Sequence, residues 1–231
     1  MKYLLASITE HLINVIDLVH QKRLKRFYSS YKLDLVIDIG SHKGEFINCV
    51  LDRNIPIYSF EPNPSVRKFL KDNTNSFNVI KYFDYAVSDE VKTINFFINQ
   101  LSSTSSLAAP NEKSLWIKFK KLILGSQELI KETITVNSVT LDSVLLDKID
   151  DYSDILLKID VEGAEGRALK GATRILNSER IKFIQIEQAA FDIYKEHNLD
   201  PHLILIKLGY KPIKKIRFPL LNFSDVVYSK F

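Results

Sequence analysis

The sequence predicts an α/β fold in which a doubly wound, mostly parallel sheet carries helices on both faces. Two observations predict it. From Leu33 onward, short apolar runs alternate with segments of helical periodicity, an order that favours parallel strands joined by right-handed crossovers. The first apolar run also leads directly into a glycine-bearing turn and then a helix, as in folds that bind nucleotides at the ends of parallel strands.

Residues 1–32 are expected to form a helical extension in front of one main domain, residues 33–231. An apolar stripe at spacings of three and four predicts an amphipathic helix, and the cations between Lys22 and Arg26 suit its C-terminal end. We expect this helix to pack on the core or on a second copy of the chain, as in a homodimer. Peripheral contact with an anionic membrane surface is the less favoured alternative. The stripe consists of Leu4, Ile8, Leu12, Val15 and Val19.

The later elements follow from local periodicity, because apolar alternation predicts strands and apolar residues three and four apart predict helices. The polar stretch 99–132, which contains the serine-rich run Ser102–Ser106, is expected to be a partly helical insertion that reaches over the site. The predicted strands span 33–39, 56–60, 78–87, 92–98, 133–141, 155–159, 182–187, 210–217 and 225–228, and the predicted helices span 44–53, 65–73, 164–176 and 201–208. After the insertion, the sheet is expected to resume with the strand 133–141.

Composition and charge narrow the class of protein. The chain has 231 residues, of which 45% are hydrophobic and 26% charged, enough for one domain with a substantial core. Residues 1–32 account for the whole net charge of +4, so the balanced remainder argues against a nucleic-acid partner. The single cysteine, Cys49, excludes an intrachain disulfide and a zinc site, and indicates a reducing, cytoplasmic setting. Neither a signal peptide nor a transmembrane segment is expected.

The loop after the first strand predicts the cofactor. Gly40 permits the turn, and the missing side chain at Gly44 lets a ligand or a backbone segment come close. Asp38 lies two residues before the first glycine, where its charge would repel the pyrophosphate of a dinucleotide. The same carboxylate would attract an ammonium group, which S-adenosylmethionine has. Together with Ser41 in the same turn, these residues predict an S-adenosylmethionine site.

Two further strand ends are expected to complete that site. Glu61 follows Asp38 by 23 residues and ends the second strand, the place where an acid accepts hydrogen bonds from ribose hydroxyls in such folds. A helix N-terminal acid is the alternative role for Glu61. Asp84, Tyr85 and Ala86 end the third strand and are candidates to face the adenine ring, although Asp84 also fits a simple turn.

Several blocks of the sequence carry a further signal. They are Val36-Ile37-Asp38-Ile39-Gly40-Ser41-His42-Lys43-Gly44, Phe60-Glu61-Pro62, Ala86-Val87-Ser88-Asp89, Thr140-Leu141-Asp142-Ser143-Val144, and Leu157-Lys158-Ile159-Asp160-Val161-Glu162-Gly163-Ala164-Glu165 followed by Leu169-Lys170-Gly171-Ala172. In this order they resemble the FkbM-type methyltransferases, a family of S-adenosylmethionine-dependent enzymes that mostly methylate oxygens. The resemblance spans roughly Leu33 to Glu187 and is absent from the N-terminal helix, from 107–132 and beyond Gln188.

The resemblance implies the class I methyltransferase fold, a Rossmann-like, mostly parallel sheet of seven strands with the cofactor across the C-terminal ends of the first two. It also implies that Asp38, Gly40, Gly44 and Glu61 contact the cofactor. A serine pair that the family often carries before a leucine is similar to Ser105-Ser106-Leu107. This segment either borders the site or is a flexible linker, and composition does not separate the two.

A second group of residues is expected to act on the methyl acceptor. Lys158 and Asp160 alternate along one strand and share a face, at the switch point where doubly wound folds bind ligands. Glu187 ends the next strand, and crowding with Glu162 is expected to raise the pKa values of these acids, as a general base requires. We expect Asp160 to be the base and to border the cofactor, with Glu162 or Glu187 next. Lys158 is expected to orient the pair or to lower the pKa of the acceptor. Glu165 is expected to stabilise a helix N-terminus.

These observations predict transfer of a methyl group from S-adenosylmethionine to a hydroxyl oxygen of a sugar, a glycan precursor or a small metabolite. N-methylation of a sugar amine and a non-catalytic cofactor-binding module are the alternatives. A divalent metal held by Asp160, Glu162 and Glu187 is chemically reasonable but disfavoured, because the sequence has no compact ligand motif. No metal is therefore expected.

Overall fold

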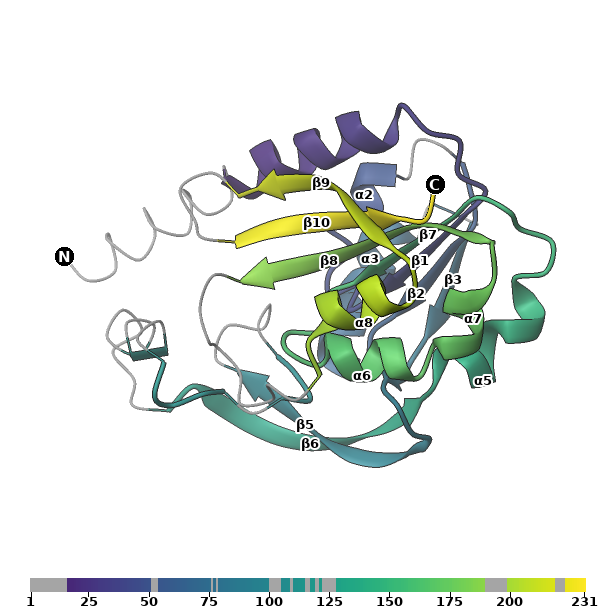
Figure 1. Cartoon of the computed structure of the whole chain (residues 1–231). Coiled ribbons are helices and arrows are strands. Elements are labelled where there is room, and N and C mark those ends of the chain that lie inside the picture. Colours follow the sequence, from purple (N-terminus) through teal and green to yellow (C-terminus); the bar gives the residue numbers. More distant parts are fainter. Residues whose placement is uncertain are drawn as a thin grey trace.

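The computed structural model describes residues 16–50, 54–75, 77, 79–99, 105–108, 110–114, 117–118, 121, 128–189, 199–218 and 223–231. Its main sheet contains β1 (Leu35–Ile39), β2 (Ile57–Phe60), β3 (Ile80–Phe83), β7 (Ile155–Ile159), β8 (Ile181–Ala189), β9 (Lys211–Arg217) and β10 (Phe223–Ser229). The strand order is β3-β2-β1-β7-β8-β10-β9 (Figure 1). The strands are parallel from β3 to β8, and β10 is antiparallel to both of its neighbours. The seven-stranded, mostly parallel sheet is therefore confirmed.

Helices cover both faces of this sheet, because successive strand residues point to opposite sides. In β1, Leu35, Ile37 and Ile39 pack in one apolar cluster, whereas Val36 packs in the other. Asp38 consequently shares the face of Val36. The first cluster includes side chains of α5 (Leu141–Leu145), α6 (Glu165–Lys170), α7 (Thr173–Asn177) and α8 (Pro201–Lys207), and the second includes side chains of α2 (Ile47–Val50), α3 (Pro64–Thr74) and the helix over residues 16–28.

A second, smaller sheet corrects two predictions. The predicted strand 78–87 is divided between β3 and β4 (Ala86–Val87), and β4 joins β5 (Lys92–Asn99) and β6 (Ile130–Val139) in the order β4-β6-β5. The expectation that the main sheet resumes at 133–141 was therefore wrong. The physical reason is that β6 pairs antiparallel with β5 and exposes about every second side chain, unlike β1 and β7, which are buried throughout.

The predicted helix 164–176 is also divided, into α6 and α7. Gly171 ends α6, since its N–H donates to the carbonyl oxygen of Arg167 and a Cβ at this position would lie 2.0 Å from the carbonyl oxygen of Ser88. Within the predicted helix 44–53, α2 covers only four residues, and residues 51–53 lie outside the described part. The predicted insertion is shorter than 99–132, because Asn99 and residues 130–132 belong to β5 and β6.

The N-terminal helix is an integral part of the core over its described residues, 16–28. Leu24 and Tyr28 are buried in the second apolar cluster, and the Tyr28 hydroxyl donates to Oε1 of Gln185 on β8 at 2.7 Å. Arg23 donates to the carbonyl oxygen of Arg217 on β9, and Figure 1 shows this purple helix along β9 and β10. The described part of the helix thus packs on the core, but through Leu24 and Tyr28 and not through the predicted stripe. Val19, the described member of that stripe, is 39% exposed, and Leu4 to Val15 lie outside the described residues. Among the described residues, no helix has the length and apolarity that a membrane span requires.

Candidate active site

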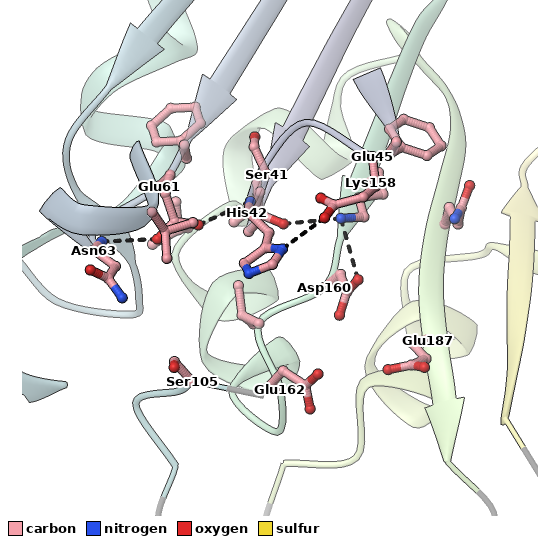
Figure 2. A pocket seen from close by; sticks show the side chains of 18 of the residues that line it. Ser41, His42, Glu45, Glu61, Asn63, Ser105, Lys158, Asp160, Glu162 and Glu187 are labelled. Atoms are coloured by element: carbon pink, nitrogen blue, oxygen red, sulfur yellow. Dashed lines mark hydrogen bonds and ion pairs between the residues drawn. The ribbon is translucent and has the colours of Figure 1, made fainter. Parts of the chain in front are cut away.

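A cavity of about 340 Å³ opens at the C-terminal ends of the parallel strands. It brings together eight of the eleven predicted site residues, from segments that are far apart in the sequence. Figure 2 shows Glu61 and Asn63 at one side of this cavity, Glu187 at the opposite side, and Asp160 and Glu162 between them. The predicted residues that line it are Gly40, Ser41, Glu61, Ala86, Lys158, Asp160, Glu162 and Glu187, whereas Asp38, Gly44 and Asp84 do not.

Gly40 is required by the close approach of two strand ends. Its φ is +77°, and a Cβ at this position would lie 1.8 Å from the carbonyl oxygen of Asp160. The N–H of Asp160 in turn donates to the carbonyl oxygen of Ile39 at 3.0 Å. The turns after β1 and β7 are therefore locked together. A side chain at position 40 would push them apart.

Gly44 has a different role from the one predicted. Its φ is +92°, and a Cβ would meet the side chains of Leu70 and Thr74 on α3, each at 3.2 Å. The close approach is thus to a helix and not to a ligand. The cofactor contact predicted for Gly44 has no support from this geometry.

Asp38 is completely buried and already has a cation. Lys158 Nζ lies 3.2 Å from Oδ1 of Asp38 and 3.3 Å from Oδ2 of Asp160, and it donates to the carbonyl oxygen of Gly40 at 3.1 Å. Burial lowers the pKa of Lys158, but the two carboxylates outweigh it, so the pKa is raised and the side chain stays protonated. The Lys158 ammonium therefore occupies the place beside Asp38 that was predicted for the ammonium of a ligand. The carboxylate that reaches the cavity at this point is Asp160, whose side chain is 36% exposed.

Ser41 and Ser59 stabilise the glycine turn from within. The Ser41 hydroxyl donates to the carbonyl oxygen of Asp38 at 2.9 Å and accepts from the Ser59 hydroxyl at 2.8 Å. Both serines are buried, although Ser41 still lines the cavity. Their hydrogen bonds join β1 to β2 where the glycine turn begins.

Glu61 is held in place by the backbone on both sides. Its Oε2 accepts from the N–H of His42 at 3.0 Å, and its Oε1 accepts from the N–H of Asn63 at 2.9 Å. Burial raises its pKa to about 7, against the effect of these hydrogen bonds. Each oxygen retains a lone pair, so the carboxylate can still accept two hydroxyl groups. This arrangement fits the predicted ribose contact.

The third strand end supplies apolar walls but no acid. Tyr85, Ala86 and Val87 line the cavity. The Asp84 side chain is 61% exposed and lies 4.0 Å from Arg67. It therefore behaves as the turn residue that was the alternative for this position, and it is not among the contacts that we propose.

Three carboxylates gather at the other side of the cavity. Oxygens of Asp160, Glu162 and Glu187 all lie within 4.8 Å of one another, close enough for a divalent ion even though they come from two segments. Burial, followed by repulsion from Asp160 and Glu162, raises the pKa of Glu187 well above its usual range. Glu165 differs, because its Oε1 accepts from the N–H groups of Val161 and Gly163 at the start of α6, as expected for a helix N-terminal acid.

The segment after β5 borders the cavity. Ser105 lines it, and the Ser106 hydroxyl lies 3.1 Å from the carbonyl oxygen of Val161 and 2.5 Å from that of Glu162. These contacts favour the interpretation that Ser105 and Ser106 border the site over the alternative that they belong to a flexible linker. Residues 102–104 lie outside the described part.

The lining residues that sequence reasoning missed include His20, Gln185 and Asp225 on neighbouring elements. Gln185 interrupts an apolar strand and lies in register with Lys158 of β7. Asp225 faces Glu187 across the antiparallel pair of β10 and β8. A polar residue inside an apolar strand was the one available signal, and it was visible for Gln185. The position of His20 depends on how the N-terminal helix docks.

Comparison with known proteins agrees with this geometry. The family model of the methyltransferase FkbM domain matches residues 38–212. Hexuronic acid methyltransferase AglP of Haloferax volcanii is 25% identical over 154 residues, which are 66% of this chain and 56% of that protein. The crystal structure of methyltransferase FkbM from Methylobacillus flagellatus KT has a TM-score of 0.55 and 14% identity, and the likeness covers 85% of this chain and 43% of that chain. The chain thus spans about half the length of these relatives.

The matched segment is longer than the resemblance read from the sequence, since it continues past Glu187 to residue 212. It contains the glycine turn, Glu61 and the strand end at Asp160. The helix over residues 16–28 and strand β10 lie outside it. Since the family model covers most of the chain and the sheet has the expected seven strands, this chain belongs to the FkbM methyltransferase family.

Proposed function

We propose that this chain transfers the methyl group of S-adenosylmethionine to a hydroxyl oxygen of a sugar, a glycan precursor or a small metabolite. The observation that carries the proposal is the cluster of carboxylates opposite Glu61 in one cavity. Glu61 provides hydrogen-bond acceptors at one side, and the acids provide a proton acceptor at the other. A methyl transfer to oxygen needs both.

The residues of the cavity fit the proposed cofactor. Glu61 suits the two ribose hydroxyls, and the backbone at Gly40 leaves no room for a side chain beside the strand ends. Phe60 and Val87 offer apolar walls for the adenine ring of the cofactor. Asp160, half-exposed and held by Lys158, is the carboxylate best placed to attract the ammonium group. When bound, the cofactor supplies an electrophilic methyl group.

The remaining chemistry is positioning and proton removal. We assign the role of general base, which takes the proton of the acceptor hydroxyl, to Glu187 in preference to Asp160. Lys158 holds Asp160, whereas burial and neighbouring acids raise the pKa of Glu187. A raised pKa makes the ionised Glu187 a stronger base. The Glu187 carboxylate would take up the proton that the acceptor hydroxyl loses when its oxygen receives the methyl group, and the electron pair of the broken bond to that methyl would stay on the cofactor sulfur. Cationic charge on the bound cofactor favours the ionised form of Glu187 beforehand.

The name of one relative bears on the class of methyl acceptor. The relative from Haloferax volcanii is named for methylation of a hexuronic acid, which supports a sugar as acceptor here. Carboxylates accept protons from hydroxyls and from ammonium groups alike, so N-methylation of an amino sugar is an outcome that the test must separate.

The test has two parts. Isothermal titration with S-adenosylmethionine should show binding that Asp160→Asn weakens by about tenfold, the typical effect of losing one hydrogen bond to a charged group. Glu187→Gln should keep that binding and lose methyl transfer from radiolabelled cofactor to a panel of neutral, amino and acidic sugars, by at least about a hundredfold. Asp84→Asn, outside the cavity, serves as the control and should change neither. Absence of cofactor binding by the unaltered chain would refute the proposal. A methylated nitrogen in the product would favour N-methylation of an amino sugar over O-methylation.

A further inference from the structure

The helix over residues 16–28 forms one wall of the cavity. Asp17, His20, Gln21 and Leu24 line it. This helix and β10 both lie outside the segment that matches the family model. Chemistry common to the family is expected within the matched segment. A wall built from unmatched segments suits recognition of the acceptor particular to this chain.

His20 on this wall is buried and oriented by a carboxylate. Its Nε2 lies 2.5 Å from Oδ2 of Asp225, with only 3% and 10% of the two side chains exposed. The His20 ring stacks on Phe218, with 3.5 Å between ring centroids. Asp225 is the register partner of Glu187, so both side chains lie on the face of the sheet that the helix covers. The pair therefore sits beside the group to which we assign the proton.

The second ring nitrogen of His20, Nδ1, is left without a partner among the described residues. Since a carboxylate only accepts hydrogen bonds, Nε2 donates to Asp225, and in the neutral ring Nδ1 carries the lone pair. Nδ1 is buried and has no hydrogen-bond partner among the residues that the structure describes. A buried acceptor without a donor is costly. Because His20 lines the cavity, a ligand bound there is the group that can supply the donor.

The charges around His20 define which donor fits. Asp225 and Asp160 offer carboxyl oxygens as acceptors, and Glu187 does the same in its ionised form. Lys158 is the single lysine or arginine among the described lining residues, and Asp38 and Asp160 already hold it. A ligand carboxylate would meet like charges and find no unengaged cation here. A hydroxyl group meets acceptors alone, which is what it requires.

We propose that helix 16–28 and β10 build an acceptor subsite, in which His20, held by Asp225, accepts a hydrogen bond from a hydroxyl of an uncharged polyol or sugar. The subsite selects such acceptors over carboxylated ones. This inference rests on the proposed function and narrows its acceptor to a class that the name of the relative from Haloferax volcanii does not suggest.

The experiment compares two sugars that differ at one carbon. Glucose and glucuronate share a ring, but glucuronate has a carboxylate in place of the hydroxymethyl group. Each is titrated by ligand-observed NMR into the full chain saturated with S-adenosylhomocysteine. We expect glucose to bind at least about tenfold more tightly than glucuronate. Equal or tighter binding of glucuronate, or no binding of glucose, would overturn the proposal.

Substitutions assign any preference to His20. His20→Phe keeps a ring for Phe218 and removes Nδ1, and it should weaken glucose binding about tenfold, as expected for a lost hydrogen bond. His20→Asn keeps an acceptor atom near the position of Nδ1 and should lose less. His202→Phe is the matched control, because His202 bonds to Tyr228 away from the cavity. Glucose affinity unchanged in a folded His20→Phe variant would overturn the assignment.

Separate readouts distinguish this proposal from the one that it rests on. Affinity for S-adenosylhomocysteine should be the same in all four proteins, because His20 is not expected to touch the cofactor. If the unaltered chain fails to bind S-adenosylhomocysteine, the proposed function fails. The two sugars can still be compared on the chain without it, and a preference for glucose there would keep the acceptor subsite.

Discussion

Removing the cation from the buried ion pair of Lys158 and Asp38 is expected to cost much stability, and Lys158→Met tests this. Asp38 has no exposed surface, and Lys158 Nζ lies 3.2 Å from its Oδ1. Methionine keeps the apolar stem beside Phe46 and removes the charge. Asp38 is then left buried without its cation. Removing one partner of a buried pair typically costs about 3–5 kcal/mol.

Two magnitudes worked from the structure agree with this range. Unit charges 3.2 Å apart attract by about 5 kcal/mol at an effective dielectric constant of about 20. The variant can instead protonate Asp38, whose ordinary pKa is 3.8. At pH 7 that costs about 4 kcal/mol, because each pH unit above the pKa is worth about 1.4 kcal/mol. The smaller cost sets the limit, so we expect a loss of about 4 kcal/mol at pH 7.

The pH dependence separates lost charge from lost packing. In the variant, the native state keeps a proton on Asp38 that the unfolded chain releases above its pKa of 3.8. The native state then binds more protons than the unfolded state, so its stability falls as pH rises. Relative to the unaltered chain, the loss should therefore shrink by about 1.4 kcal/mol for each unit below pH 7. At pH 5 it should be about 1–2 kcal/mol.

Urea unfolding at pH 5, 6 and 7 without cofactor measures these values. Lys182→Met is the control, because Lys182 pairs with Asp154 at 2.5 Å but is 30% exposed, and we expect it to lose no more than about 1 kcal/mol. Adding Asp38→Asn to Lys158→Met should restore most of the loss at pH 7. A loss under about 1 kcal/mol at pH 7, or a loss that does not change with pH, would refute the reasoning.

Three further predictions test the turn at Gly40, the proposed ribose contact of Glu61 and the burial of Cys49. Gly40→Ala should lose at least about 2 kcal/mol of stability in thermal unfolding, since its Cβ would lie 1.8 Å from the carbonyl oxygen of Asp160. The control Gly209→Ala, with φ +87° and nothing within 4 Å, should lose about 1 kcal/mol, and equal losses in the two variants would contradict the clash. Glu61 has a pKa of about 7, so affinity for S-adenosylmethionine by titration calorimetry should rise about tenfold from pH 6 to pH 8 as the carboxylate ionises, and Glu61→Gln should remove this rise. Burial raises the pKa of Cys49 to about 12, so iodoacetamide at pH 8 should label it only when the chain unfolds; rapid labelling of the native chain would count against its burial.

The order of strands and helices and the position of the glycine turn were predictable because they depend on local periodicity. The continuous apolar runs of β1 and β7 and the acids that follow parallel strands have signals within a few residues. Even so, the strand of β6 was assigned to the wrong sheet. Alternation shows which side of a strand is buried, but it does not show which strand lies beside it.

The sequence alone determined the fold class, the family, and the strand ends at which the cavity opens. The partners of the buried charges were decided only by tertiary structure, since Asp38 meets Lys158 through the register of β1 and β7. In the same way, docking of the N-terminal helix brings His20 to Asp225 across 205 residues of sequence. The physical reason is that periodicity fixes the face on which a side chain lies, whereas the packing of whole elements decides what that face meets.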